Sequence, residues 1–171
     1  FNDFKDLLLG SVEVPLLQDR YDKLMIMNQF LKERSADFYS LIESIYDDRD
    51  LFAYIIQNLP YFYDESEYKG EKVYFYKRAQ LLTSDLLHVR EKLDGLKVNY
   101  HHLVGCADYK IPQVMRCYGI LEFDQELSDL VDRKIAIASD SDMEIEIRAN
   151  DIVVIDYIAR KLEEKCARID I

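Results

Sequence analysis

The chain lacks an excess of basic residues, because acids outnumber them, and this balance limits the partners that it can bind. It carries 22 lysines and arginines against 33 aspartates and glutamates, which gives a formal net charge of −11 at pH 7. A surface that follows a phosphate backbone needs clustered lysine and arginine side chains. The composition therefore argues against a nucleic-acid polymer as partner and leaves a single small nucleotide possible.

Cysteine is scarce and follows no recognisable spacing. The three cysteines are Cys106, Cys117 and Cys166. They form neither a C-x-x-C pair nor an even disulfide set, which favours a reduced, cytoplasmic setting. Two of the three histidines are adjacent, and none has the cysteine or acid spacing of a zinc site. We therefore predict no metal site and no cofactor.

Long apolar runs are also absent, since no stretch of the sequence is long enough to span a bilayer. The 171 residues are 49% hydrophobic, which is enough for one domain with a core. Apolar residues recur at steps of three and four along most of the chain, which is typical of helices with one buried face. We predict an all-α fold, with residues 1–171 as a single helical domain.

The individual helices are predicted from their apolar stripes and from their capping residues. We expect helices over 1–9, 16–33, 35–46, from 48 or 50 to 58, 73–93, 112–118, 124–132 and 151–166. The expected N-caps are Ser35, Asp48 or Asp50, Asp124 and Asn150. Residues 61–65 are expected to form a loop held by its aromatic rings, with a pocket wall as the alternative. Residues 143–147 are either a short extended piece or the lead into the final helix.

The stretch from Cys106 to Leu121, CADYKIPQVMRCYGIL, is the centre of the functional interpretation. It places Asp108 in a short turn ahead of a helix that has Pro112 in its first turn and ends at Gly119, as proline and glycine favour. A carboxylate in that turn lies near the positive end of the helix dipole, which favours its ionised form. On the residues alone, a turn or capping role for Asp108 is the simpler interpretation.

Three blocks of sequence change this interpretation. They are FYKRAQ at 75–80, ADYKIPQ at 107–113 and EIEIR at 144–148. With these blocks in this order, the chain resembles the queuosine salvage protein family over nearly all of its length. The resemblance implies a queuosine 5′-phosphate N-glycosidase that releases the base queuine for salvage into tRNA modification. It also implies a helical architecture similar to that of helical DNA glycosylases.

The resemblance implies roles for five residues. Asp108 would stabilise the oxocarbenium charge that develops on the sugar as the N-ribosidic bond breaks. Cys106 stands where the family has an aromatic that reads the base, so Tyr109 or another aromatic would take over the stacking. Lys77 and Arg78 are neighbours that point about 100° apart on a helix, so one is expected to bind the phosphate while the other pairs with a carboxylate. Structural ion pairs are the alternative for both.

Two other functional hypotheses are compatible with the sequence. The likeness to helical DNA glycosylases suggests an enzyme that acts on nucleic acid, although the acidic composition opposes it. A non-catalytic helical interaction module is the other hypothesis. The resemblance also implies family segments before residue 1 and after residue 171, so we expect the chain to be part of a longer protein and to be inactive on its own. The expected partners are the small-molecule substrate, the product queuine and the rest of the protein's own chain, with no membrane.

Overall fold

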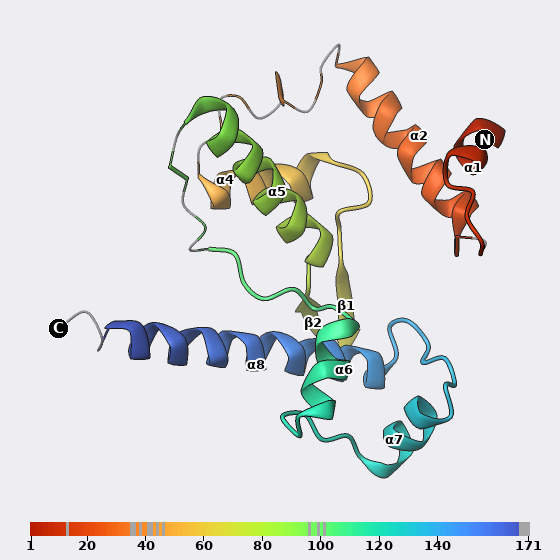
Figure 1. The fold of residues 1–171 in the computed structure, drawn as a ribbon, viewed down its shortest axis with the longest axis vertical. Coiled ribbons are helices and arrows are strands. Elements are labelled where there is room, and N and C mark those ends of the chain that lie inside the picture. The colour runs from red at the N-terminus through yellow and green to blue at the C-terminus, as the bar shows by residue number, and fades with distance from the viewer. Residues whose placement is uncertain are drawn as a thin grey trace.

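A computed structural model describes residues 1–12, 14–34, 37, 39–40, 43, 45, 47–95, 97–98, 100 and 102–167, without the side chains of 164–167. The elements in chain order are α1 (Asn2–Leu7), α2 (Leu17–Glu33), α4 (Asp48–Asn58), β1 (Glu65–Tyr68), β2 (Glu71–Tyr74), α5 (Lys77–Asp94), α6 (Lys110–Cys117), α7 (Gln125–Asp132) and α8 (Asp142–Ala167) (Figure 1). The mostly helical fold is confirmed.

The all-α prediction did not include one element, because β1 and β2 form a small antiparallel hairpin. Tyr68 pairs with Glu71, so that only Lys69 and Gly70 form the turn. Both turn residues have positive φ angles, 51° and 86°, which is the two-residue turn whose twist suits a hairpin. Glycine accepts this conformation at no steric cost, and the flanking residues alternate between the two faces.

The hairpin also corrects the predicted helix over 73–93. Val73 and Tyr74 belong to β2, and α5 begins only at Lys77. Between them Tyr76 adopts a left-handed conformation, with φ 49°, which turns the chain from the strand into the helix. Hairpin and helix are therefore joined by a tight corner, and this corner fixes the direction in which Lys77 leaves the backbone.

Some predicted helix boundaries are confirmed and others are wrong. Asp124 caps α7 by accepting the Leu127 N–H at 2.8 Å, and Gly119 takes the left-handed conformation just after α6. The N-cap of α4 is Asp47, not Asp48 or Asp50. Asp47 accepts two backbone N–H groups of the first turn, whereas Asp48 is buried inside the helix. The cap prediction missed by one residue because all three positions carry the same side chain.

The final helix begins nine residues earlier than predicted. Residues 143–147 are helical, so the extended alternative is wrong, and Asn150 lies inside α8 instead of capping it. Ser141 caps the N-terminus of α8, because its hydroxyl accepts the Glu144 N–H and its carbonyl accepts the Ile145 N–H. The longer α8 therefore carries Glu144, Arg148 and Asp151 on one continuous helix.

The N-terminal helices agree with the predicted boundaries to within two residues, but the predicted helix over 35–46 cannot be assessed. Its expected cap, Ser35, and most of its expected apolar stripe lie outside the described residues. Residues 61–64 form a loop, as predicted. The ring of Tyr63 makes an edge contact with Tyr76 at 5.9 Å between centroids, so an aromatic contact does hold this loop.

Two buried apolar clusters lie among the described residues. The larger cluster joins α2, α4 and α5 through Phe30, Leu51, Ile55, Leu59, Ala79 and Leu87. The smaller one consists of Phe75, Ala107 and Ile145, which come from the end of the hairpin, the loop before α6 and the first turn of α8. Figure 1 shows these three segments meeting where α8 passes beneath the hairpin. The second cluster thus packs the loop that carries Asp108 against the hairpin and α8.

No helix among the described residues is long and apolar enough to cross a membrane.

Gly105 allows the loop before α6 to approach α8 closely. A Cβ atom at this position would lie 2.7 Å from the Ile155 Cβ and 2.8 Å from its Cδ1, which is well inside van der Waals contact. We therefore expect Gly105→Ala to lower the free energy of unfolding by about 1–3 kcal/mol, as overpacking of a tight contact does. Urea unfolding of the purified chain measures this change.

The control for this prediction is a double-mutant cycle with Ile155→Ala, which removes the Cγ2 and Cδ1 atoms that the new methyl group would meet but leaves the Ile155 Cβ. The double variant should be less destabilised than the sum of the two single variants. Strict additivity would show that the loop does not depend on this approach.

Candidate functional site

Asp108 lies in the turn ahead of α6, at the position predicted from the sequence. Its Oδ1 accepts the backbone N–H groups of Tyr109, at 2.5 Å, and Lys110, at 3.4 Å. These N–H groups belong to the start of α6, where they have no intrahelical partner. The carboxylate is therefore oriented by the helix that it precedes, and its second oxygen, Oδ2, is free to face another group.

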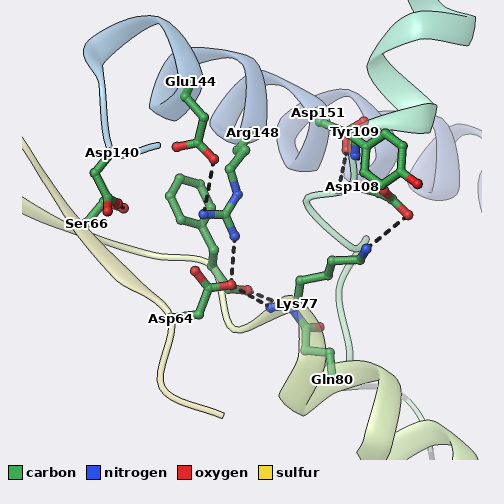
Figure 2. Close-up of polar contacts among 11 residues, drawn as sticks. Asp64, Ser66, Lys77, Gln80, Asp108, Tyr109, Asp140, Glu144, Arg148 and Asp151 are labelled. Atoms are coloured by element: carbon green, nitrogen blue, oxygen red, sulfur yellow. Dashed lines mark hydrogen bonds and ion pairs between the residues drawn. The ribbon is translucent and has the colours of Figure 1, made fainter. Parts of the chain in front are cut away.

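That second group is Lys77, at the first position of α5. The Lys77 Nζ lies 3.1 Å from Asp108 Oδ2, and the two side chains are 25% and 27% exposed. Figure 2 shows the lysine reaching across from α5 to the aspartate. Burial alone would favour the neutral acid, but Lys77 and the Tyr109 N–H outweigh it and hold the pKa of Asp108 below its usual value. Asp108 is thus a charged carboxylate at neutral pH.

The start of α5 is itself held by an acid from the loop just before the hairpin. Asp64 Oδ2 accepts the Lys77 backbone N–H at 3.3 Å, and the Asp64 carbonyl accepts the Phe75 N–H at 3.0 Å. A carboxylate at this point also suits the positive end of the helix dipole. The direction of the Lys77 side chain is therefore set by the corner at Tyr76 and by Asp64 together.

A second pair of charges comes from the first two turns of α8. Arg148 lies 2.7 Å from Asp64 Oδ2 and 3.6 Å from Glu144 Oε1, and its guanidinium covers the Phe75 ring at 3.9 Å from the centroid (Figure 2). Glu144 Oε2 is buried and has no hydrogen-bond partner among the described residues. Burial, although opposed by Arg148, raises the pKa of Glu144 above its usual value. Glu144 is therefore more easily protonated than Asp108, whose pKa is lowered.

These groups line one pocket of about 400 Å³. Its charged lining residues are Lys77, Asp108, Glu144 and Arg148, and Figure 2 shows the first two on one side and the last two on the other. Its apolar wall consists of Ala107, Pro112, Phe123, Val131, Ile137 and Ile147. The volume lies in the range of small-molecule sites, and a few convergent polar groups within an apolar lining are typical of them.

The five residues singled out from the sequence do not all meet in this pocket. Asp108, Lys77 and Tyr109 line it, whereas Cys106 and Arg78 are not among its lining residues. Cys106 is a half-buried free thiol whose pKa is raised by burial, and Arg78 is exposed. Tyr109 is 68% exposed, with the Lys110 and Lys77 ammonium groups 5.6 and 5.9 Å from its ring centroid. Its ring is therefore available at the edge of the pocket.

Three residues near Asp108 were not predicted as site residues: Glu144, Arg148 and the buried Asp151. Glu144 and Arg148 both belong to the EIEIR block, and their spacing of four places them on one face if that block is helical. Asp151 follows three residues later, and its Oδ2 accepts the Asp108 backbone N–H at 3.2 Å. Recognising the helix from residue 142 would have identified Glu144 and Arg148 as candidates.

One other group of side chains has the composition of a metal site. Ligand atoms of Asp47, Asp48 and His102 lie within 4.8 Å of one another, away from the pocket. Hydrogen bonds account for all three residues, because Asp47 caps α4 while the two oxygens of Asp48 bind the N–H and the Nδ1 of His102. The group therefore ties His102 to α4, and we assign it no metal.

Comparison with known proteins identifies the family. A family model described as queuosine salvage protein matches residues 2–170. A queuosine 5′-phosphate N-glycosylase/hydrolase from Sphaerobacter thermophilus is 35% identical over 172 residues, covering 99% of this chain and 53% of that protein. Proteins of the same name from Mus musculus and Nematostella vectensis are 30% and 31% identical, over 90% and 91% of this chain and 46% of each relative. The chain spans about half the length of these relatives, and it belongs to the queuosine salvage protein family.

Proposed function

We propose that the protein cleaves the N-glycosidic bond of queuosine 5′-phosphate and releases queuine. The observation that carries this proposal is a carboxylate, Asp108, that is kept ionised by Lys77 on the wall of a nucleotide-sized pocket. The names of the relatives supply the substrate, because each is called a queuosine 5′-phosphate N-glycosylase/hydrolase. The position and the ionised state of Asp108 support a role in breaking such a bond.

Asp108 would act on the sugar. As the bond between C1′ and the base nitrogen breaks, its electron pair leaves with the base and positive charge develops on the ribose. A fixed carboxylate stabilises that charge more than it stabilises the neutral ground state, and this difference lowers the barrier. Water then adds to C1′, which gives ribose 5-phosphate, and the departing base takes up a proton.

Glu144 would act on the leaving base. Queuine is a 7-deazaguanine, so its base lacks the N7 that purine hydrolases commonly protonate. A departing base of this kind needs a hydrogen-bond donor elsewhere on its ring. The raised pKa of Glu144 and its unpartnered, buried Oε2 suit that task, because a protonated carboxyl can donate. Two carboxyl groups with pKa values displaced in opposite directions are the pattern of a charged stabiliser and a proton donor.

The other expectations about the whole protein stand as predictions. They are a cytoplasmic location, an architecture similar to helical DNA glycosylases, and the need for family segments outside these residues. A glycosylase that acts on nucleic acid remains less favoured because of the net charge of −11. A non-catalytic module is disfavoured by the convergence of four charged side chains in one pocket.

One assay separates these functions. The natural full-length polypeptide is incubated with queuosine 5′-phosphate, with the nucleoside queuosine and with queuosine-containing tRNA, and free queuine is measured. The proposal requires release from the nucleotide. Release from tRNA alone would favour the polymer-acting enzyme, and no release from any substrate would favour the interaction module.

Lys77 and Arg78 form a matched pair for testing where the phosphate binds. Lys77 lines the pocket and Arg78 does not, so we expect Lys77→Ala to weaken binding of the nucleotide by roughly 1.5–3 kcal/mol more than binding of the nucleoside, as loss of a charged hydrogen bond does. Arg78→Ala should change neither. Calorimetric titration with both ligands measures the difference. Equal losses for nucleotide and nucleoside in Lys77→Ala would mean that Lys77 acts only through Asp108.

A further inference from the structure

Asp151 is a carboxyl group that the proposed chemistry does not use. It lies on α8, is completely buried and is not among the residues that line the pocket. Its Oδ1 has no hydrogen-bond partner among the described residues. Burying an ionisable group with an unsatisfied oxygen costs free energy, and an apolar side chain of similar size would avoid this cost. Such a group is therefore a candidate for a functional role.

Among the described residues, the Asp151 side chain makes one hydrogen bond, and its partner is the turn that carries Asp108. Its Oδ2 accepts the backbone N–H of Asp108 at 3.2 Å, across 43 residues of sequence. The same N–H lies 2.7 Å from the Cys106 carbonyl oxygen, so the turn has one local and one distant acceptor. Figure 2 shows Asp151 beside Asp108, with this bond drawn from the backbone of the turn.

The local hydrogen bond closes only a three-residue turn, and such a turn does not by itself fix how the loop sits on the rest of the fold. Asp151 supplies that connection, because α8 also carries Glu144 and Arg148 on the opposite wall of the pocket. One turn further along, Ile155 packs against Gly105 of the same loop. The helix thus contacts the loop on both sides of Cys106 and Ala107.

We propose that Asp151 is a positioning residue that fixes Asp108 relative to α8 by accepting its backbone N–H. The inference rests on the proposed function, because Asp151 acts on the reaction only through Asp108. A displacement of a reacting group by about 1 Å costs on the order of a hundredfold in rate. The bond between Asp151 and the Asp108 N–H therefore affects the rate far more than it affects substrate affinity.

Three substitutions at Asp151 test separately the hydrogen-bond acceptor, the charge and the volume of its side chain. Asp151→Ala removes the acceptor, Asp151→Leu removes it while filling the space, and Asp151→Asn keeps an oxygen acceptor without the charge. In the natural full-length polypeptide we expect the Ala and Leu variants to release queuine about tenfold to a hundredfold more slowly, with nucleotide affinity nearly unchanged. The Asn variant should retain most of the wild-type rate.

Hydrogen exchange of the Asp108 amide, followed by NMR without any substrate, gives a second readout. Exchange should be faster in the Ala and Leu variants and close to wild type in the Asn variant. Wild-type rates in Asp151→Leu, or an equal loss in Asn and Leu, would overturn the inference, as would a rate loss that only follows the melting temperature. If the wild-type protein releases no queuine, the proposed function fails, and the exchange data alone decide whether Asp151 holds the turn.

Discussion

Asp108→Asn is expected to slow the release of queuine by roughly a hundredfold to a thousandfold, because removal of one electrostatic stabiliser of a transition state commonly costs that much. The substitution keeps the shape of the side chain while it removes the negative charge. The sugar is uncharged before the bond breaks, so the loss falls on the transition state and nucleotide binding should persist. Single-turnover release of queuine, together with nucleotide affinity, measures both effects.

The fold should tolerate this substitution. An asparagine oxygen can still accept the Tyr109 and Lys110 N–H groups that Asp108 Oδ1 accepts now. The Lys77 ammonium loses its partner but is 25% exposed, so water can solvate it. Asp124→Asn is the matched control, because Asp124 also serves a helix N-terminus but does not line the pocket.

The control variant should release queuine at the wild-type rate. An unchanged rate in Asp108→Asn would remove this carboxylate from the chemistry. If a lower melting temperature, and so a loss of folded protein, accounts for the whole loss of rate, Asp108 has a purely structural role at the start of α6.

The parts of the fold that were predicted correctly depend on local signals. Asp124 ahead of α7 and Gly119 after α6 act within a few residues of the backbone groups that they serve. The same holds for Asp108, whose turn and position near the start of α6 follow from the proline and glycine that bound this helix. Local hydrogen bonds decide these features, so the sequence alone is enough to predict them.

The errors arose where two local signals compete. Residues 73–76 continue the apolar periodicity of α5, but the Lys69-Gly70 turn pairs Val73 and Tyr74 with β1 instead. At the start of α8, Asn150 is a good capping residue, but Ser141 comes first and the helix that it begins runs through Asn150 without interruption. A periodic pattern cannot decide such cases, because strand pairing and packing against the rest of the fold determine the outcome.

The opposite wall of the site depends on contacts between distant parts of the chain. The bond between Arg148 and Asp64 joins residues 84 apart in the sequence, and the bond between Asp151 and Asp108 joins residues 43 apart. Neither spacing follows from a helical or strand period. Only the arrangement of α8 beneath the hairpin and the loop before α6 brings these side chains together, so Asp151 could be found only in three dimensions.

The second large effect expected is a change in stability with pH that originates at Asp151. Burial, with a smaller contribution from the nearby negative charge of Asp108, raises the pKa of Asp151 from 3.8 to about 6. Cys106 is the other titratable group close to it, and its thiol pKa is also raised by burial. In the unfolded chain Asp151 returns to an ordinary pKa of about 3.9.

The sign of the effect follows from linkage between proton binding and folding. Between pH 4 and pH 6 the folded protein holds a proton on Asp151 that the unfolded chain has released, so stability falls as the pH rises. The contribution is fully present below about pH 4 and is lost once the pH has passed about 6. With a shift of about two units, the loss is about 3 kcal/mol.

Asp151→Asn removes this titration, so its free energy of unfolding relative to wild type should rise by about 3 kcal/mol between pH 4 and pH 8. A buried amide group without a partner adds a constant cost, which leaves the slope with pH unchanged. Urea unfolding of both proteins at several pH values gives the difference, in which the other carboxyl groups cancel. In an Asp108→Asn background the step should move to lower pH, because the charge that helps to raise the Asp151 pKa is gone. A difference that stays flat from pH 4 to pH 8 would show that Asp151 does not titrate in this range.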